Sequence, residues 1–173
     1  MTQSRSLLLA AVALVGLTSC GGSDLRKTRP VTGTVLVDGK PAAGAQVYLH
    51  PLFEERDRLP IHPLAIADDA GRFAVSTYNE ADGAPEGEYV LTVEWKQRSG
   101  MSPHLGGPDF LDGQYANKDA NKAKPEFKVT VGAGPVELPP FKLTQSAEAK
   151  RKAEDFKKRA GQPGQGGMMT GGK

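Results

Sequence analysis

Hydrophobic and polar residues alternate most clearly just after residue 30. Over 31–37, VTGTVLV, three valines and a glycine fall on one face of a period-two pattern, and two threonines and a leucine fall on the other. Asp38 and Gly39 then have the residue types of a tight turn, because glycine adopts positive φ without strain. A second alternating run follows over 45–50. The pattern predicts a pair of strands joined by a turn within 31–51.

Five further stretches have strand patterns. They lie at 63–67, 72–78, 87–95, 126–131 and 136–143. The stretch 87–95, GEYVLTVEW, alternates most cleanly and contains no edge-protecting device, so we expect it in the interior of its sheet. Pro139 and Pro140 interrupt the last stretch, which predicts an edge strand or a bulge.

No helical pattern occurs between residues 30 and 143, so the sequence predicts an all-β domain. Seven short strands at this spacing are typical of a β-sandwich. The segment 96–125 contains several prolines and glycines and is long for a connection within a compact domain. Such loops are usually functional or disordered.

The C-terminal part of the chain has a different composition. Residues 146–160, SAEAKRKAEDFKKRA, predict a helix with acid–base pairs four residues apart. From Ser146 onward the chain carries seven basic residues against three acidic ones. This segment is either a solvated helix or a contact to an anionic lipid or polymer surface. Residues 161–173, GQPGQGGMMTGGK, are low in complexity and are predicted to be disordered.

The N-terminus has the pattern of an export signal. Arg5 precedes the apolar run 7–17, which is too short to span a bilayer but has the length of a signal-peptide core. The run ends in LTSC, with Cys20 as its last residue, and this sequence resembles a bacterial lipobox. The resemblance implies that Cys20 carries acyl chains such as palmitate and becomes the mature N-terminus. Gly21 is not the aspartate-type signal that retains some lipoproteins in the inner membrane. The prediction is an anchored protein facing the periplasm or exterior, on the outer membrane rather than the inner one.

The composition of the chain restricts the class of protein further. Hydrophobic residues make up 38% of the chain, and 21 glycines and 13 prolines fit a turn-rich β domain with disordered ends. The net charge of +2 gives no general electrostatic case for nucleic acid. A single cysteine excludes a disulfide framework or a cysteine-based zinc site within one chain.

Three motifs together resemble carboxypeptidase regulatory-like domains. GTVLVDGKPAAGAQVYL matches the start of that family at Gly33, Val35, Gly39, Pro41, Gly44, Ala45 and Val47. DDAGRFAV, residues 68–75, is similar to the family's hairpin, and DGAPEGEYVLTV, residues 82–93, is similar to its P-x-G-x-Y strand entry. LDGQYANKDANKAKPEFKVTV is similar to the closing half of a lipoprotein subgroup.

The resemblance implies a seven-stranded, prealbumin-like (transthyretin-like) β-sandwich with no catalytic residues. The expected organisation is a lipoprotein signal peptide at 1–19, a tether at 20–30, the β-sandwich at 31–144, a basic helix at 145–160 and a Gly-rich tail at 161–173.

Candidate chemistry is sparse. His50, His62 and His104 are the three histidines, and they lack spacings such as H-x-H or H-E-x-x-H. No EF-hand, P-loop, dinucleotide or G-x-S-x-G motif occurs. We therefore expect no cofactor, no metal and no catalytic residue.

Aromatic residues in and beside the long loop are the best candidates for ligand binding. They are Trp95, Phe110 and Tyr115, with His104 between them. Exposed aromatics on the loops of a rigid domain bind peptides or sugars in many proteins. The alternative is that Phe110 and Tyr115 pin the loop onto the domain.

The sequence thus predicts a non-catalytic, lipid-anchored module with a structural or protein-interaction role at the cell envelope. Its expected partners are the membrane, through Cys20, and an envelope protein or glycan. The second hypothesis is a carbohydrate- or peptide-binding domain that uses the 96–125 loop. The third and least supported is a metal-dependent enzyme on the same fold.

Overall fold

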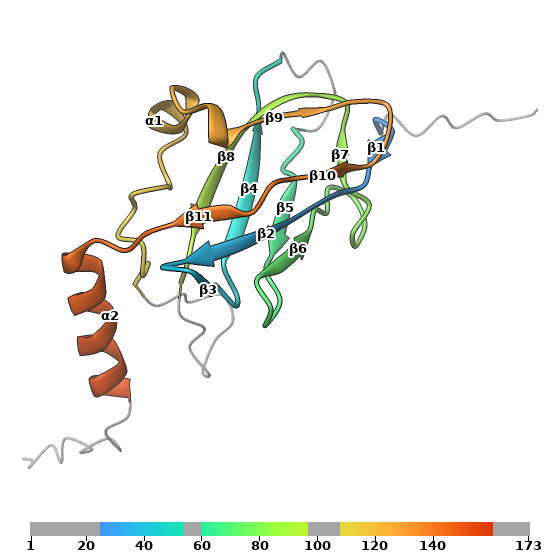
Figure 1. The fold of residues 1–173 in the computed structure, drawn as a ribbon. Helices are drawn as coiled ribbons and strands as arrows, with labels where there is room; N and C mark the ends of the chain where they lie inside the picture. Colours follow the sequence, from blue (N-terminus) through green and yellow to red (C-terminus); the bar gives the residue numbers. More distant parts are fainter. Residues whose placement is uncertain (1–24, 54–59, 97–107, 161–173) are drawn as a thin grey trace, which may run out of the picture.

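The computed structural model describes residues 25–53, 60–96 and 108–160 (Figure 1). Two predicted site residues, Cys20 and His104, lie outside these ranges, as do the predicted signal peptide and the Gly-rich tail.

The elements follow one another in short segments. In chain order they are β1 (Thr28–Arg29), β2 (Val31–Val37), β3 (Lys40–Pro41), β4 (Gln46–Pro51), β5 (Leu64–Ile66), β6 (Arg72–Ala74), β7 (Ala84–Pro85), β8 (Gly87–Glu94), α1 (Lys118–Lys122), the 3-10 helix η1 (Pro125–Phe127), β9 (Lys128–Val131), β10 (Val136–Glu137), β11 (Phe141–Leu143) and α2 (Ala147–Ala160).

Strand β2 is the centre of a five-stranded sheet. It pairs antiparallel with β6 and β3, and parallel with β10 and β11. A second sheet is antiparallel, in the order β5-β4-β8-β9, and β1 and β7 form a small third sheet. The prediction of a mostly β domain with a C-terminal helix is confirmed.

The alternation in β2 has the predicted consequence. Val31, Gly33, Val35 and Val37 are buried, whereas Thr32, Thr34 and Leu36 are exposed or half-buried. Asp38 and Gly39 both have positive φ, 49° and 76°, and form a two-residue turn that pairs Val37 with Lys40.

The predicted pairing of the two strands within 31–51 is wrong. The partner of β2 across the turn is the two-residue strand β3, and β4 belongs to the other sheet. The chain crosses between sheets at Gly44, whose φ is 78° and whose N–H donates to the carbonyl of Ala67, the residue directly after β5 of the second sheet. Alternation predicted the strands but not their partners.

The prediction that the stretch 87–95 lies inside its sheet is confirmed, because β8 lies between β4 and β9. Tyr89, Leu91 and Val93 are fully buried on one face. Val90 and Thr92, on the other face, are also only 2% and 3% exposed, because α1 packs against β8.

The prediction of no helix between residues 30 and 143 is wrong. Asn117 caps α1 by accepting hydrogen bonds from the N–H groups of Asp119 and Ala120, at 2.9 and 3.1 Å. The helix has five residues, of which only Asn121 is buried, so it has no apolar stripe that a sequence pattern could reveal. Pro125 begins η1, and the strand predicted from residue 126 therefore starts at Lys128.

Side chains from both large sheets form one core. Four rings run through it in sequence. Their centroid separations are 5.8 Å for Tyr115–Phe127, 6.0 Å for Phe127–Phe141 and 6.3 Å for Phe141–Phe73. This row of rings links the β2 sheet to η1 and to the segment before α1.

The C-terminal helix is confirmed as α2, and the Oγ of Ser146 accepts a hydrogen bond from the N–H of Ala149 at 3.0 Å. The last two strands, β10 and β11, pair only with β2 among the described residues, as expected for the edge interrupted by Pro139 and Pro140. In the described parts of the chain, no helix is long and apolar enough to cross a membrane.

Candidate functional site

Two of the predicted aromatic residues lie together, and the third lies elsewhere. The rings of Trp95 and Phe110 meet edge to face at a centroid separation of 5.6 Å, and Phe110 is only 7% exposed. The indole N–H of Trp95 donates to the carbonyl of Ala43 at 2.9 Å. Tyr115 instead stacks on Phe127, and its hydroxyl hydrogen-bonds to Thr144 at 3.3 Å. Trp95, Phe110 and Tyr115 therefore all make contacts within the protein.

Asp109 organises the turn that carries Phe110. Its carboxylate accepts hydrogen bonds from the N–H groups of Trp95 at 2.8 Å, Leu111 at 3.0 Å and Gly113 at 2.9 Å. One side chain therefore fixes the end of β8 against the turn at residues 109–113. Sequence analysis did not single out Asp109, although an aspartate two residues before a turn amide is a usual Asx-turn signal.

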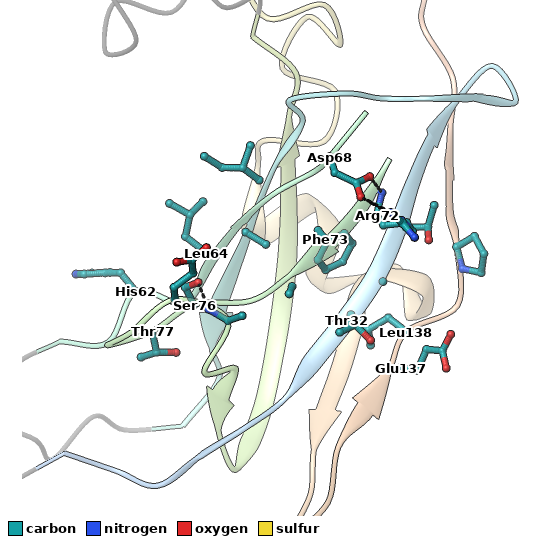
Figure 2. A pocket seen from close by; sticks show the side chains of 18 residues that line it. Thr32, His62, Leu64, Asp68, Arg72, Phe73, Ser76, Thr77, Glu137 and Leu138 are labelled. Carbon is teal, nitrogen blue, oxygen red and sulfur yellow. Dashed lines mark hydrogen bonds and ion pairs between the residues drawn. The ribbon is translucent and has the colours of Figure 1, made fainter. Parts of the chain in front are cut away.

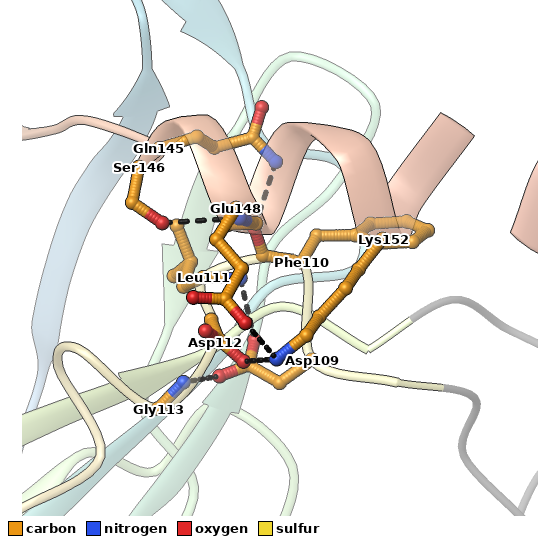
Figure 3. A network of polar contacts seen from close by, with 10 residues as sticks. Asp109, Phe110, Leu111, Asp112, Gly113, Gln145, Ser146, Glu148 and Lys152 are labelled. Atoms are coloured by element: carbon orange, nitrogen blue, oxygen red, sulfur yellow. Dashed lines mark hydrogen bonds and ion pairs between the residues drawn. The ribbon is translucent and has the colours of Figure 1, made fainter. Parts of the chain in front are cut away.

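Helix α2 docks on this turn (Figure 3). The side-chain amide of Gln145 donates to the carbonyl of Phe110 at 2.7 Å, and the Lys152 ammonium lies 2.7 Å from a carboxylate oxygen of Asp112. Ala149 and Ala153, on the same helix, are 0% and 6% exposed. The basic helix is thus attached through its first two turns to the region that holds Trp95 and Phe110.

A groove of about 840 Å³ opens on the surface of the domain (Figure 2). It lies between β5 and β6 and extends over β2 and β10. Its lining includes the hydroxyls of Thr32, Thr34, Ser76 and Thr77, the apolar side chains of Leu64, Ile66, Ala74 and Leu138, and the charged side chains of Asp68, Arg72, Glu80 and Glu137.

Contacts beside the groove hold β5 and β6 together at both ends of their hairpin. Leu64 and Ser76 exchange two backbone hydrogen bonds at one end. At the other end Asp68 forms an ion pair with Arg72 at 2.9 Å and accepts hydrogen bonds from backbone N–H groups. Those hydrogen bonds, with that of Arg72 first, hold the pKa of Asp68 below its usual value. Asp68 is therefore a turn-stabilising residue, which agrees with its place in the DDAGRF motif.

A second, smaller pocket of about 300 Å³ lies where β4 ends beside α1. It is lined by His50, Pro51, Leu52, Phe53, Val90, Lys118, Asp119 and Lys122. The Nε2 of His50 lies 2.8 Å from the hydroxyl of Thr92. Burial lowers the pKa of His50, and the charges of Lys118 and then His62 lower it further. The pocket combines two cations with apolar side chains, a combination that sequence analysis missed because α1 was not expected.

We expect the pKa of His50 to depend on its burial and on the positive charge of Lys118. In an NMR titration the imidazole of His50 should titrate below 6.5, its ordinary value, and Lys118→Ala should raise the midpoint by removing a nearby positive charge. Because the folded-state pKa is the lower one, the contribution of His50 to stability is complete above pH 6.5 and is lost as the pH falls through the folded-state value.

Lys142→Ala, on β11 of the other sheet, is the matched control and should leave the midpoint unchanged. A midpoint for His50 at or above 6.5 would contradict its burial beside Lys118.

Within 25–53, 60–96 and 108–160, no group of three or more His, Cys, Asp or Glu side chains is placed to hold a metal ion.

No protein-family model matches this chain, and no curated protein matches it. Among solved structures it is similar to part of a 9R-lipoxygenase from Cyanothece PCC8801, at 13% identity over 68% of this chain and 16% of that one, with a TM-score of 0.35. It is also similar to part of a leucine-rich repeat protein from Bacteroides thetaiotaomicron VPI-5482, at 14% identity over 70% of this chain and 12% of that one, with a TM-score of 0.33. The chain spans less than a fifth of either protein, and TM-scores this low carry no argument about fold family or function.

Proposed function

We propose that the protein is a lipid-anchored module of the cell envelope that acts through interaction with other envelope components and catalyses no reaction. The observation that carries this proposal is the LTSC sequence directly after an eleven-residue apolar run, with Cys20 as the one cysteine of the chain. A lone cysteine at the end of an export signal has a ready explanation as an acylation site.

We further propose that the domain is a transthyretin-like β-sandwich of the carboxypeptidase regulatory-like type. The motifs that suggest it have structural roles in the fold. DDAGRF forms the turn between β5 and β6, and PEGEY leads into β8, where the hydroxyl of Tyr89 donates to the carbonyl of Pro85 at 2.8 Å. Side chains of both large sheets share one core, as the two layers of a sandwich do.

Several carboxylates of the protein stabilise loops and turns, which supports a role of the domain as a scaffold. Asp82 accepts hydrogen bonds from the N–H groups of Thr77 at 2.7 Å, Tyr78 at 3.2 Å and Asn79 at 3.1 Å. Asp109 and Asp68 stabilise turns in the same way. All three carboxylates hold turns or loops in place through bonds to backbone N–H groups.

The position of the N-terminus supports an anchored domain with one end near the membrane. The described chain begins beside β1, whereas α2 projects from the opposite side of the molecule (Figure 1). A tether from Cys20 would therefore hold the β1 end towards the bilayer. The docked helix α2 would then extend away from it.

Cys20→Ala tests the anchor. We expect the variant to move from the membrane fraction to the soluble fraction on ultracentrifugation and to lose incorporation of labelled palmitate, because no acyl chain remains to bind the bilayer. Ser19→Ala is the matched control. It keeps a small residue before the cysteine and should stay membrane-bound and labelled. A Cys20→Ala protein that remains in the membrane fraction would overturn the proposed anchor.

A further inference from the structure

Cationic and apolar side chains gather along the edge of the domain at which the tether begins. They are Arg26, Leu52, Phe53, Lys118 and Lys122, which we name the cationic edge. The guanidinium carbon of Arg26 lies 4.9 Å from the ring centroid of Phe53. The other four residues line one pocket, between the end of β4 and α1. Residues from three separate segments thus form a continuous surface.

Two large apolar side chains are exposed on or next to this edge. Leu52 is 40% exposed, and Leu25, directly before Arg26, is 50% exposed. Apart from Ile66, they are the large hydrophobic residues most exposed in the described part of the chain. Exposed leucines beside basic residues are the composition with which peripheral proteins insert into a lipid interface.

The charge of the edge is positive. Lys118 and Lys122 lie one helical turn apart on α1, and neither forms an ion pair with a described residue. Lys27 is exposed next to Arg26, and Lys128 lies across from Val90, which lines the pocket. The opposing carboxylates are those of Asp119, in the pocket, and Glu88, whose carbonyl binds the N–H of Leu52. Among the residues of this surface that the structure describes, cations therefore exceed carboxylates.

The length of the tether brings the edge to the bilayer. Leu25 lies five positions after Cys20, and an extended chain of five such steps spans at most about 18 Å. In Figure 1, α1, the end of β4 and β1 lie along the same upper edge of the molecule, and α2 lies on the other side. An acylated Cys20 would therefore hold the cationic edge within a short distance of the lipid head groups.

We propose that the cationic edge docks on the anionic phospholipid head groups of the membrane that holds Cys20, with Leu25 and Leu52 entering the interface. This proposal rests on the lipid anchor proposed above. It adds that the domain has a fixed orientation on the bilayer. The lysines of α1 contact the head groups, and the β5–β6 groove and α2 stay accessible to partners.

The test uses the mature chain from residue 20 with Cys20→Ser, which carries no acyl group. We expect it to cosediment with phosphatidylglycerol–phosphatidylcholine vesicles and not with vesicles of phosphatidylcholine alone. Lys118→Ala/Lys122→Ala should lower the partition coefficient by about 25-fold, since each basic residue at an anionic surface contributes about fivefold, on the order of 1 kcal/mol. Circular dichroism of each variant verifies that the domain is folded.

Arg151→Ala/Lys158→Ala is the matched control, because it removes two exposed cations from α2. It should change the partition coefficient by less than about twofold if α2 faces away from the bilayer. Equal losses in the two double variants would overturn the proposal, as would an absence of binding to the anionic vesicles. Equally tight binding of soluble poly-glutamate would also overturn it, by identifying a general anion site. The acylation of Cys20 is tested separately by fractionation, so the anchor and the docking surface can fail independently.

Discussion

Gly83→Ala is expected to destabilise the domain severely. Gly83 has a φ of 88°, which costs an alanine about 1–2 kcal/mol, and an added Cβ would overlap the carbonyl group of Arg29. The overlapping atoms belong to the backbone of Arg29. Because Arg29 of β1 pairs with Ala84 of β7, this backbone cannot move without disrupting that small sheet. The combined cost should exceed about 4 kcal/mol, a large part of the 5–15 kcal/mol that stabilises a typical domain. Thermal unfolding followed by circular dichroism measures it.

Substitutions at two other glycines distinguish the cost of a positive φ from the cost of the overlap with Arg29. Gly39 has a φ of 76° but open space around it, so Gly39→Ala should cost only the conformational term, about 1–2 kcal/mol. Gly132 has open space and no positive φ, and Gly132→Ala should change stability by less than about 0.5 kcal/mol. If Gly83→Ala were no more destabilising than Gly39→Ala, the close approach of residue 83 to β1 would be disproved.

Phe127→Ala should produce the second large loss. Phe127 is 2% exposed and stacks between Tyr115 and Phe141 in the row of rings that links the β2 sheet to η1 and to the segment before α1. Removing a buried phenylalanine costs about 3–5 kcal/mol, because the cavity is only partly filled by its neighbours. Each stacked pair adds about 0.5–1.5 kcal/mol beyond buried area. We expect the melting temperature to fall by more than about 10 °C.

Ile66→Ala is the control for Phe127→Ala. Ile66 is a β5 residue of comparable hydrophobicity, but its side chain is 56% exposed. Its truncation should cost less than about 1 kcal/mol. Chemical denaturation of both variants at equal protein concentration compares them. A similar loss for both would mean that Phe127 lies outside the core.

Local features of the fold could be predicted from the sequence, and long-range ones could not. The valines of β2 and the alternating residues of β8 are buried as their pattern indicates, because a strand places alternate side chains on opposite faces. Whether β4 pairs with β2 or with β8 depends on the positive φ of Gly44 and its bond to Ala67, a contact across 23 positions of sequence. Alternation contains no information about such a partner.

In the candidate sites, too, the local features could be predicted from the sequence and the long-range contacts could not. Trp95 and Phe110 stand out as aromatic residues near a long loop. The turn that joins them depends on Asp109, whose local turn bond to Leu111 a sequence can suggest but whose distant bond to the N–H of Trp95 it cannot. Lys118 and Lys122 become part of a surface only when α1 packs beside β4. A five-residue helix without an apolar stripe leaves no periodic signal, so this surface became evident only from the coordinates.

Pro139 and Pro140 would have a consequence if the protein is held on a membrane through Cys20, as proposed above. Copies anchored in this way would diffuse in two dimensions and would meet often. The outer edge of the sheet formed by β10 and β11 could then lie against the same edge of a neighbouring copy. Two adjacent imide nitrogens supply no N–H there, so a neighbouring strand cannot extend its ladder along the edge. If the proposed anchor is correct, the proline pair would let copies of the domain crowd on a bilayer without forming a continuous intermolecular sheet.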